Sequence, residues 1–282
     1  MQFTAVSWNL FHGRDFPPNP ALFTWRSRLF RVTERDATHV QANRDLRDEF
    51  AGLLAGAEWD VALLQECPPR FAEPLARACR AEAHRVLTSR NSFGWLRSLA
   101  AQLNPDLIAS GEGGSNLVLA RKWGPLGRIV ERRELVVHEG RPERRAMAFV
   151  RTASGVCVAN LHATNDRPAL AAEDVLKAAQ ASVEWAGEAP LLFGGDLNLR
   201  PGEDPGIFDL LRERFGLEGP SGPDAIDHLL ARGLTIVEPA ASWPAGRREL
   251  RRIDGLSVRL SDHAPVTGRF ETGSGQPASP QE

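Results

Sequence analysis

Polar residues that could do chemistry directly follow apolar, strand-like runs at four places in the chain. They are Asn9, Glu66, His162, and Asp196 with Asn198. A fifth group, "SDHAP", places Asp262 and His263 just before another such run. A single polar residue there usually satisfies backbone groups at a turn. Repeated placement at strand ends instead predicts that these side chains share one site.

The oxygen-bearing members of this set indicate a hard divalent cation. Carboxylates and amides without a thiolate suit Mg²⁺ or Mn²⁺ better than Zn²⁺. The oxygen donors are Asn9, Glu66, Asp196, Asn198 and Asp262. A cation that neutralises phosphoryl oxygens, a carboxylate that orients water, and the imidazoles of His162 and His263 meet the needs of phosphate-ester hydrolysis. The residues alone therefore predict a metal-assisted hydrolase.

Strand-like and helical patterns alternate along the chain and must position these residues. Besides "FTAVSW", strands are expected at 59–66, 83–89, 115–121, 127–140, 144–152, 155–162, 190–196, 225–233, 234–240 and 263–270. Helices are expected over 43–56, 70–82, 168–187 and 205–215. Hairpins mixed with helix crossovers predict layered α/β structure with more than a single parallel sheet.

Composition is that of an ordinary globular protein, with 282 residues, 42% hydrophobic residues and 25% charged residues. No apolar run is long enough to span a membrane, and no leader pattern is present at the N-terminus. We expect one domain over 1–270, a disordered tail over 271–282, and no obligate protein partner. Cys67, Cys79 and Cys157 are odd in number and far apart, which predicts reduced thiols and a cytoplasmic protein.

The charge of the chain gives mixed information on whether it binds nucleic acid. The net charge of -2 argues against bulk electrostatic binding of nucleic acid but leaves room for a local basic groove. Within the segment 14–42, the residues around Trp25 and Phe30 include four arginines, Arg26, Arg28, Arg31 and Arg35. These arginines either contact phosphates or form a solvated helix face compensated by Glu34 and Asp36.

Six short motifs occur in the order "SWNL", "LLQE", "NLHATN", "GGDLN", "IDHLL" and "SDHAPV", and they span residues 7–266. In type and order they resemble the endonuclease/exonuclease/phosphatase superfamily, which includes deoxyribonuclease I, apurinic endonucleases, sphingomyelinases and inositol polyphosphate 5-phosphatases. The resemblance implies a metal-dependent phosphoric ester hydrolase. It also implies a four-layer α/β sandwich, in which two mixed β-sheets pack face to face and are flanked by helices.

Residue by residue, the resemblance implies that Glu66 is the central metal ligand, with Asn9 and Asp262 beside it. Asp196 would activate or orient the attacking water, and Asn198 would fix that water or a phosphate oxygen. The metal would be Mg²⁺ or Mn²⁺.

The resemblance also gives roles to two histidines. His263 would face the phosphate, paired with Asp227 of "IDHLL". His162 stands where the deoxyribonuclease I and sphingomyelinase branches have a histidine and apurinic endonucleases have a tyrosine. This chain contains no tyrosine at all.

Three assignments have alternatives. Asp254 of "RRIDGL" is also an Ile-Asp pair, but it lies too close to Asp262 for a strand, turn and return, so Asp227 is preferred. Asn165 either contacts phosphate or caps the helix that starts near Pro168. Arg200 either reaches a phosphate or is a surface arginine.

The motifs specify phosphoester hydrolysis better than they specify the ester. A secretion signal and an exposed aromatic hairpin, expected of a phospholipase, are not seen, and neither is the "P-x-W-C-D-R" element of inositol phosphatases. We therefore expect a phosphodiesterase that acts as a nuclease on DNA or RNA, without membrane association. The alternatives are a phosphomonoesterase, a phospholipase-type hydrolase, and a catalytically silent binding module.

Overall fold

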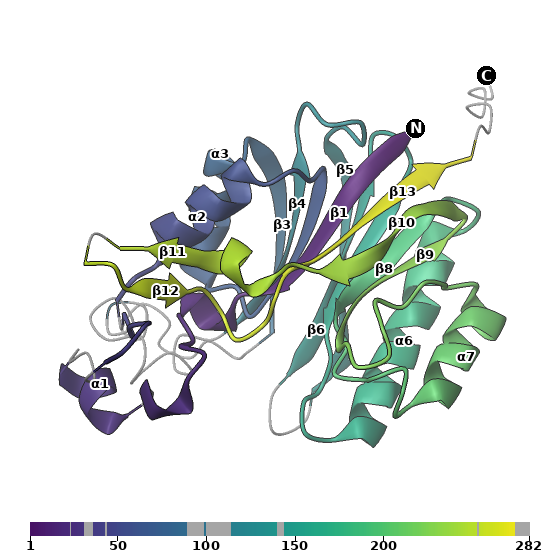
Figure 1. The fold of residues 1–282 in the computed structure, drawn as a ribbon. Helices are drawn as coiled ribbons and strands as arrows, with labels where there is room; N and C mark the ends of the chain where they lie inside the picture. The colour runs from purple at the N-terminus through teal and green to yellow at the C-terminus, as the bar shows by residue number, and fades with distance from the viewer. Residues whose placement is uncertain are drawn as a thin grey trace.

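The structure is a computed structural model that describes residues 1–22, 24–30, 36–42, 44–88, 99, 114–139, 144–252 and 254–273. In these residues two mixed β-sheets pack face to face, and helices cover their outer faces (Figure 1). The layered α/β sandwich expected from the sequence is confirmed.

The larger sheet has six strands in the order β10-β13-β1-β2-β4-β3. The strands are β1 (Gln2–Asn9), β2 (Val61–Gln65), β3 (Ala81–Leu87), β4 (Ser115–Arg121), β10 (Leu234–Ser242) and β13 (Val266–Thr272). β1 and β2 run parallel, whereas the other neighbours in this sheet are antiparallel.

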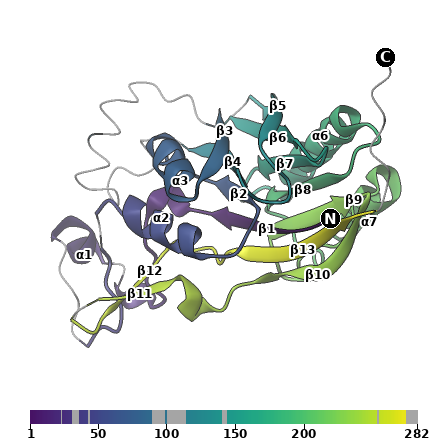
Figure 2. The same cartoon turned by 90° about the horizontal axis from the view of Figure 1, so that it is seen from above.

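The second sheet has five strands in sequence order. They are β5 (Ile129–His138), β6 (Arg145–Thr152), β7 (Cys157–His162), β8 (Leu191–Asp196) and β9 (Asp227–Arg232). β7 and β8 are parallel, and the remaining pairs are antiparallel. A separate hairpin of β11 (Glu249–Arg251) and β12 (Ser257–Arg259) lies at the same end of the molecule as α1 (Trp25–Phe30) (Figure 2).

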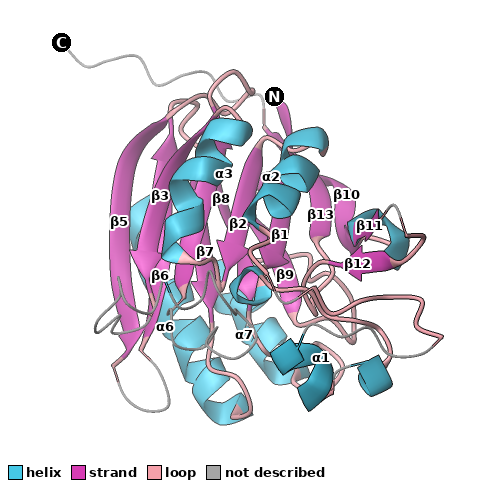
Figure 3. Ribbon diagram, turned by 90° about the vertical axis from the view of Figure 1, so that its left-hand side faces the viewer, coloured by secondary structure: helices cyan, strands magenta, loops and turns pink. Residues whose placement is uncertain are grey.

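Helices flank the two sheets on opposite sides (Figure 3). α2 (Arg47–Gly56) and α3 (Ala72–Ala78) cover the six-stranded sheet, whereas α6 (Pro168–Ala186) and α7 (Pro205–Phe215) cover the five-stranded sheet. The helix expected over 70–82 is too long. It ends at Ala78 because Arg80 takes a left-handed conformation with φ 52° and turns the chain into β3.

Alternation along β1 shows how one strand serves two cores. Val6 and Trp8 point outward and pack with α2 and α3, whereas Phe3 and Ala5 point inward and pack against the second sheet. All four side chains are almost fully buried. β1 is therefore buried on both faces, whereas a period-2 pattern by itself requires only one buried face.

Two buried amides join the sheets beneath the strand ends that carry the polar motifs. Gln65 Nε2 donates to Asn160 Oδ1 at 2.7 Å, and Asn160 Nδ2 donates to the carbonyls of Leu64 and Leu117, both at 3.0 Å. These hydrogen bonds fix how the two sheets register, because any sliding would break them, although the buried Gln65 Oε1 has no partner among the described residues. The relative position of β2 and β7 is thereby set.

Some expectations concern the chain ends and the arginine-rich segment. Residues 271 and 272 pair with β1 and β10 as part of β13, so the expected disordered tail began two residues too early. Residues 274–282 lie outside the described part of the chain. So do Arg31 and Arg35, whereas Trp25 and Phe30 of α1 are exposed.

Neither a disulfide nor a membrane-spanning helix is found among the described residues. Cys67, Cys79 and Cys157 are buried thiols that form no disulfide with one another, and burial raises the pKa of the Cys79 and Cys157 thiols to about 11. No described helix has the length and apolar character needed to cross a bilayer. A cytoplasmic location stays a prediction.

Substitution of Gly195 in "GGD" tests the packing that brings β8 to the site. Its φ is 127°, and a Cβ there would lie 1.9 Å from the carbonyl oxygen of Leu161. We expect Gly195→Ala to lower the free energy of unfolding by about 3 kcal/mol or more, measured by chemical denaturation. Gly52→Ala is the control, because nothing lies within 4 Å of that helical position. It should be neutral or stabilising by up to about 1 kcal/mol, and an equal loss in both variants would contradict the packing argument.

Candidate active site

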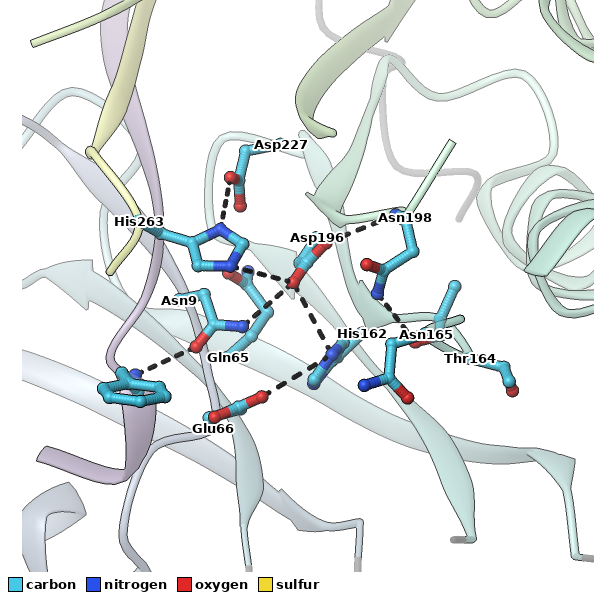
Figure 4. Close-up of polar contacts among 12 residues, drawn as sticks. Asn9, Gln65, Glu66, His162, Thr164, Asn165, Asp196, Asn198, Asp227 and His263 are labelled. Carbon is cyan, nitrogen blue, oxygen red and sulfur yellow. Dashed lines mark hydrogen bonds and ion pairs between the residues drawn. The ribbon is translucent and has the colours of Figure 1, made fainter. Parts of the chain in front are cut away.

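The polar motifs meet where β1, β2, β7 and β8 end and β9 begins (Figures 1 and 4). The strand register aligns three of their residues in a row, because His162 lies opposite Asp196 and Asp196 lies opposite Asp227. β1 contributes Asn9 from the other sheet, and Glu66 directly follows β2. The site is thus built across the junction of the two sheets.

Asp196 is the centre of this group (Figure 4). Its carboxylate is 1% exposed. Oδ2 accepts a hydrogen bond from Asn9 Nδ2 at 2.9 Å and lies 3.5 Å from His162 Nε2 and 3.8 Å from His263 Nε2. The backbone N–H of Asn198 donates to Oδ1 at 3.2 Å. Segments far apart in the sequence therefore contact one carboxylate.

His263 pairs with Asp227, at 2.7 Å between Nδ1 and Oδ2. The alternative partner, Asp254, lies beyond β11 and pairs with Arg252 at 2.9 Å. The structure thus brings His263 to the aspartate preferred from the sequence.

A buried arginine holds the turn that carries His263. Arg248 donates to the carbonyls of Ser261 and His263, and Trp8 Nε1 donates to the latter carbonyl at 3.0 Å. Ser261 Oγ also donates to the carbonyl of Asn9 at 2.6 Å. The turn is therefore fixed to the end of β1.

The Nδ1 atom of His162 faces an arginine, whereas the Nδ1 atom of His263 faces a carboxylate. Arg145 is the buried first residue of β6, and its Nη1 atom lies 3.2 Å from His162 Nδ1. A guanidinium group has donors and no acceptor, so Nδ1 must accept and the ring hydrogen must be on Nε2. That hydrogen faces Asp196 and Glu66, and His162 Nε2 lies 3.9 Å from Glu66 Oε1.

The two histidines are held in opposite protonation states. Burial, followed by the charge of Arg145, lowers the pKa of His162 well below its usual value, so this ring is neutral. Burial also opposes the charge on His263, but Asp227, Asp196 and Asp262 outweigh it and raise its pKa to about 10. Burial and then the charge of Asp227 raise the pKa of Asp196 to about 7.

Glu66, Asn9 and Asp262 offer oxygen donors beside this centre. Glu66 is partly buried, with 22% of its side chain exposed, and it interacts electrostatically with both Asp196 and Asp262. Asn9 Oδ1 accepts one hydrogen bond, from the backbone of Phe11, which leaves a lone pair. Mutually repelling carboxylates next to an amide oxygen fit a hard divalent cation, which would relieve the repulsion.

A second group of donors is better explained by proton chemistry. Asp196, Asp227 and His263 each present an atom within 4.8 Å of the others. The hydrogen bond of His263 Nδ1 to Asp227 and its raised pKa keep this imidazole protonated, and a protonated imidazole does not bind metal.

Three further predicted residues lie at the rim. Asn198 Nδ2 donates to the carbonyl of Ala163 at 3.1 Å, which holds the side chain beside the site. Asn165 is exposed and accepts a hydrogen bond from Arg145 at 3.3 Å, whereas the residue that caps α6 is Arg167, without a side-chain cap. Arg200 points to solvent, with 42% of its side chain exposed, near Glu203.

Two residues of the site had no assigned role in the sequence analysis. Arg145 contacts His162 only because β6 pairs with β7, and no local motif indicates this. His12 lies 3.1 Å from Glu66, between Nε2 and Oε2. The sequence signal that could have identified His12 is the cluster of polar residues that follows Asn9.

Comparisons with known proteins define the class. The sequence profile of the Endonuclease/Exonuclease/phosphatase family matches residues 6–263. The chain belongs to this family, and it is a metal-dependent phosphoric ester hydrolase. No curated protein sequence matches the chain.

Solved structures share the fold at low sequence identity. An endonuclease/exonuclease/phosphatase from Beutenbergia cavernae is 17% identical with a TM-score of 0.64, over 99% of this chain and 73% of that one. A mannosyl-6-phosphatase from Bacteroides thetaiotaomicron is 13% identical with a TM-score of 0.61, over 95% and 99%. Truncated TDP2 from Caenorhabditis elegans is 16% identical with a TM-score of 0.55, over 96% and 98%.

The Asp227 and His263 pair predicts a pH dependence. A pKa near 10 keeps His263 charged below that pH, so a rate that needs the charge falls as the pH rises through 10. In Asp227→Asn the pKa of His263 drops, so this fall moves to lower pH and kcat at pH 8 decreases about 10- to 1,000-fold. The measurement is kcat against pH with a chromogenic phosphodiester.

Asp254→Asn is the matched control for this experiment. It removes the same charge from the other Ile-Asp pair and should leave the pH profile unchanged. A profile of Asp227→Asn identical to that of the wild type would contradict the assigned pairing.

Proposed function

We propose that this enzyme is a Mg²⁺- or Mn²⁺-dependent phosphodiesterase that acts as a nuclease on DNA or RNA. The observation that carries the proposal is the buried carboxylate of Asp196, set between a neutral His162 and a charged His263. Such a centre orients water on one side and donates hydrogen bonds to phosphoryl oxygens on the other.

Each residue has a distinct task in this proposal. Asp196 holds the attacking water and accepts its proton, because its raised pKa makes it a stronger base than an exposed aspartate. His263 stabilises the charge that develops on the phosphoryl oxygens, and Asp227 maintains its protonated state. His162 keeps its Nε2 hydrogen and donates a hydrogen bond from it, while Asn198 fixes the water or a phosphate oxygen.

The metal ligands in this proposal are Asn9, Glu66 and Asp262. The bound cation would neutralise charge on the phosphoryl oxygens. The imidazoles of His162 and His263 supply the hydrogen bonds.

The charge at the centre favours a diester over a monoester. A phosphomonoester carries between one and two negative charges at neutral pH, whereas a diester carries one. Asp196 faces one charged and one neutral imidazole, and Asp227 and Glu66 add further negative charge. A singly charged phosphate is therefore the better match.

Exposed arginines near the site support a polymeric substrate. Arg200 follows Asn198 by two residues, and Arg247 stacks on Trp243 with 3.8 Å between the guanidinium carbon and the ring centroid. Asn165 is exposed beside His162. These groups would bind neighbouring backbone phosphates. Arg248, by contrast, is buried under the turn at 261–263 and supports structure.

A second candidate is hydrolysis of a sugar phosphate. A cleft of about 290 Å³ next to His263 is lined by Asp224, Ser242 and Asp262 among others. Acidic side chains would accept hydrogen bonds from hydroxyl groups and would repel further phosphates. The fold likeness to a mannosyl-6-phosphatase is consistent with this candidate.

Removal of the central metal ligand tests the proposed activity. EDTA should abolish hydrolysis of a chromogenic phosphodiester, and Mn²⁺ or Mg²⁺ should restore it. Glu66→Gln should lower kcat/KM about 1,000-fold, and its affinity for Mn²⁺ should fall in calorimetry. Glu73→Gln, an exposed change on α3, is the control. Unchanged metal affinity in Glu66→Gln would contradict the ligand assignment.

Substrate competition separates the two candidates. Plasmid nicking, single-strand digestion and abasic-site cleavage are measured beside hydrolysis of a hexose phosphate. A nuclease should give a higher kcat/KM on nucleic acid. A higher value on the hexose phosphate would favour the second candidate, and turnover of neither with any metal would favour a binding module.

A further inference from the structure

A strained turn directly after Asn9 carries His12 into the site. Phe11, His12 and Gly13 have φ angles of 48°, 53° and 73°, all in the left-handed region. Non-glycine residues are strained in that region, and such strain persists where surrounding structure enforces it.

Packing and hydrogen bonds enforce this turn. Asn9 Oδ1 accepts from the backbone of Phe11 at 2.9 Å, and Gly13 N donates to the carbonyl of Leu10 at 2.8 Å. A Cβ at Gly13 would lie 2.6 Å from the ring of Phe71. The strain has one clear geometric result, which is the position of the His12 imidazole.

The imidazole of His12 lies beside the carboxylate assigned as the central metal ligand. His12 Nε2 is 3.1 Å from Glu66 Oε2, and 18% of the His12 side chain is exposed. Two ligands bonded to one cation at about 2.1 Å and at right angles lie about 3.0 Å apart. The observed distance matches this spacing, and it is also the distance of a direct histidine–carboxylate contact, so the Glu66 carboxylate and the imidazole could hold one cation between them without a large movement.

The local backbone also indicates that His12 and Glu66 are held in place as a pair. Glu66 also has a positive φ, of 46°, so both members of the pair are held in unusual conformations. Nδ1 of His12 is buried and has no hydrogen-bond partner among the described residues. The side chain is therefore oriented by the turn and by its Nε2 contact.

We propose that His12 is a nitrogen ligand of the metal centre, bound beside Glu66. This inference rests on the metal site of the proposed function and deepens it. Imidazole nitrogen binds first-row transition metals readily, whereas Mg²⁺ prefers oxygen. The site therefore selects Mn²⁺ over Mg²⁺.

The test is the coordination of Mn²⁺ in the full-length protein. Electron spin echo envelope modulation should detect nitrogen coupling to bound Mn²⁺ in the wild type and lose it in His12→Gln. Calorimetry should show Mn²⁺ affinity reduced about 10-fold or more, with Mg²⁺ affinity changed less than about threefold.

The matched control is His39→Gln. His39 makes a similar histidine–carboxylate contact with Glu249, at 3.2 Å, outside the metal site. This variant should keep the nitrogen coupling and the ratio of the two affinities. Circular dichroism spectra and melting temperatures of all variants establish that each is folded.

Two results would overturn the role of His12. One is the absence of nitrogen coupling in the wild type, and the other is its persistence in His12→Gln, which would assign the nitrogen to another histidine. Either could occur while Glu66→Gln still loses metal affinity, so the proposed function would stand. If Glu66→Gln kept its Mn²⁺ affinity, the metal site itself would be wrong.

Discussion

The site depends on one constraint, which is the burial of the Asp196 carboxylate between a neutral histidine and a positively charged one. The ring of His162 is neutral because it is buried and faces the donors of Arg145, and His263 is charged because it faces Asp227. Without the charged imidazole and the amide of Asn9, the buried carboxylate would be costly to ionise.

The fold is arranged to supply that environment. The row of His162, Asp196 and Asp227 follows from strand register alone. Adjacent glycines let β8 approach its neighbours so closely that a Cβ at Gly194 would lie 2.2 Å from the carbonyl of His228. The paired amides of Gln65 and Asn160 hold the sheets in place beneath this row. Close packing and buried hydrogen bonds thus fix the positions of the strand ends that carry the site.

Much of this could be predicted from the sequence, and the limits have physical reasons. Apolar, strand-like runs located the strands that carry the site, because these strands are buried and regular. The choice of Asp227 rather than Asp254 as the partner of His263 followed from chain length, because too few residues separate Asp254 from Asp262 for a strand, a turn and a return. Arg145 was not assigned, since it reaches His162 through β6–β7 pairing and not through a local motif. The role of His12 depends on three successive left-handed residues, a conformation that "FHG" does not reveal.

The protonation states of the two histidines test the account most directly. Nuclear magnetic resonance of ¹⁵N-labelled side chains in the metal-free protein at pH 8 reports which ring nitrogens carry hydrogen. The account predicts hydrogen on both nitrogens of His263 and on Nε2 alone of His162. A neutral His263, or a His162 ring with its hydrogen on Nδ1, would contradict it.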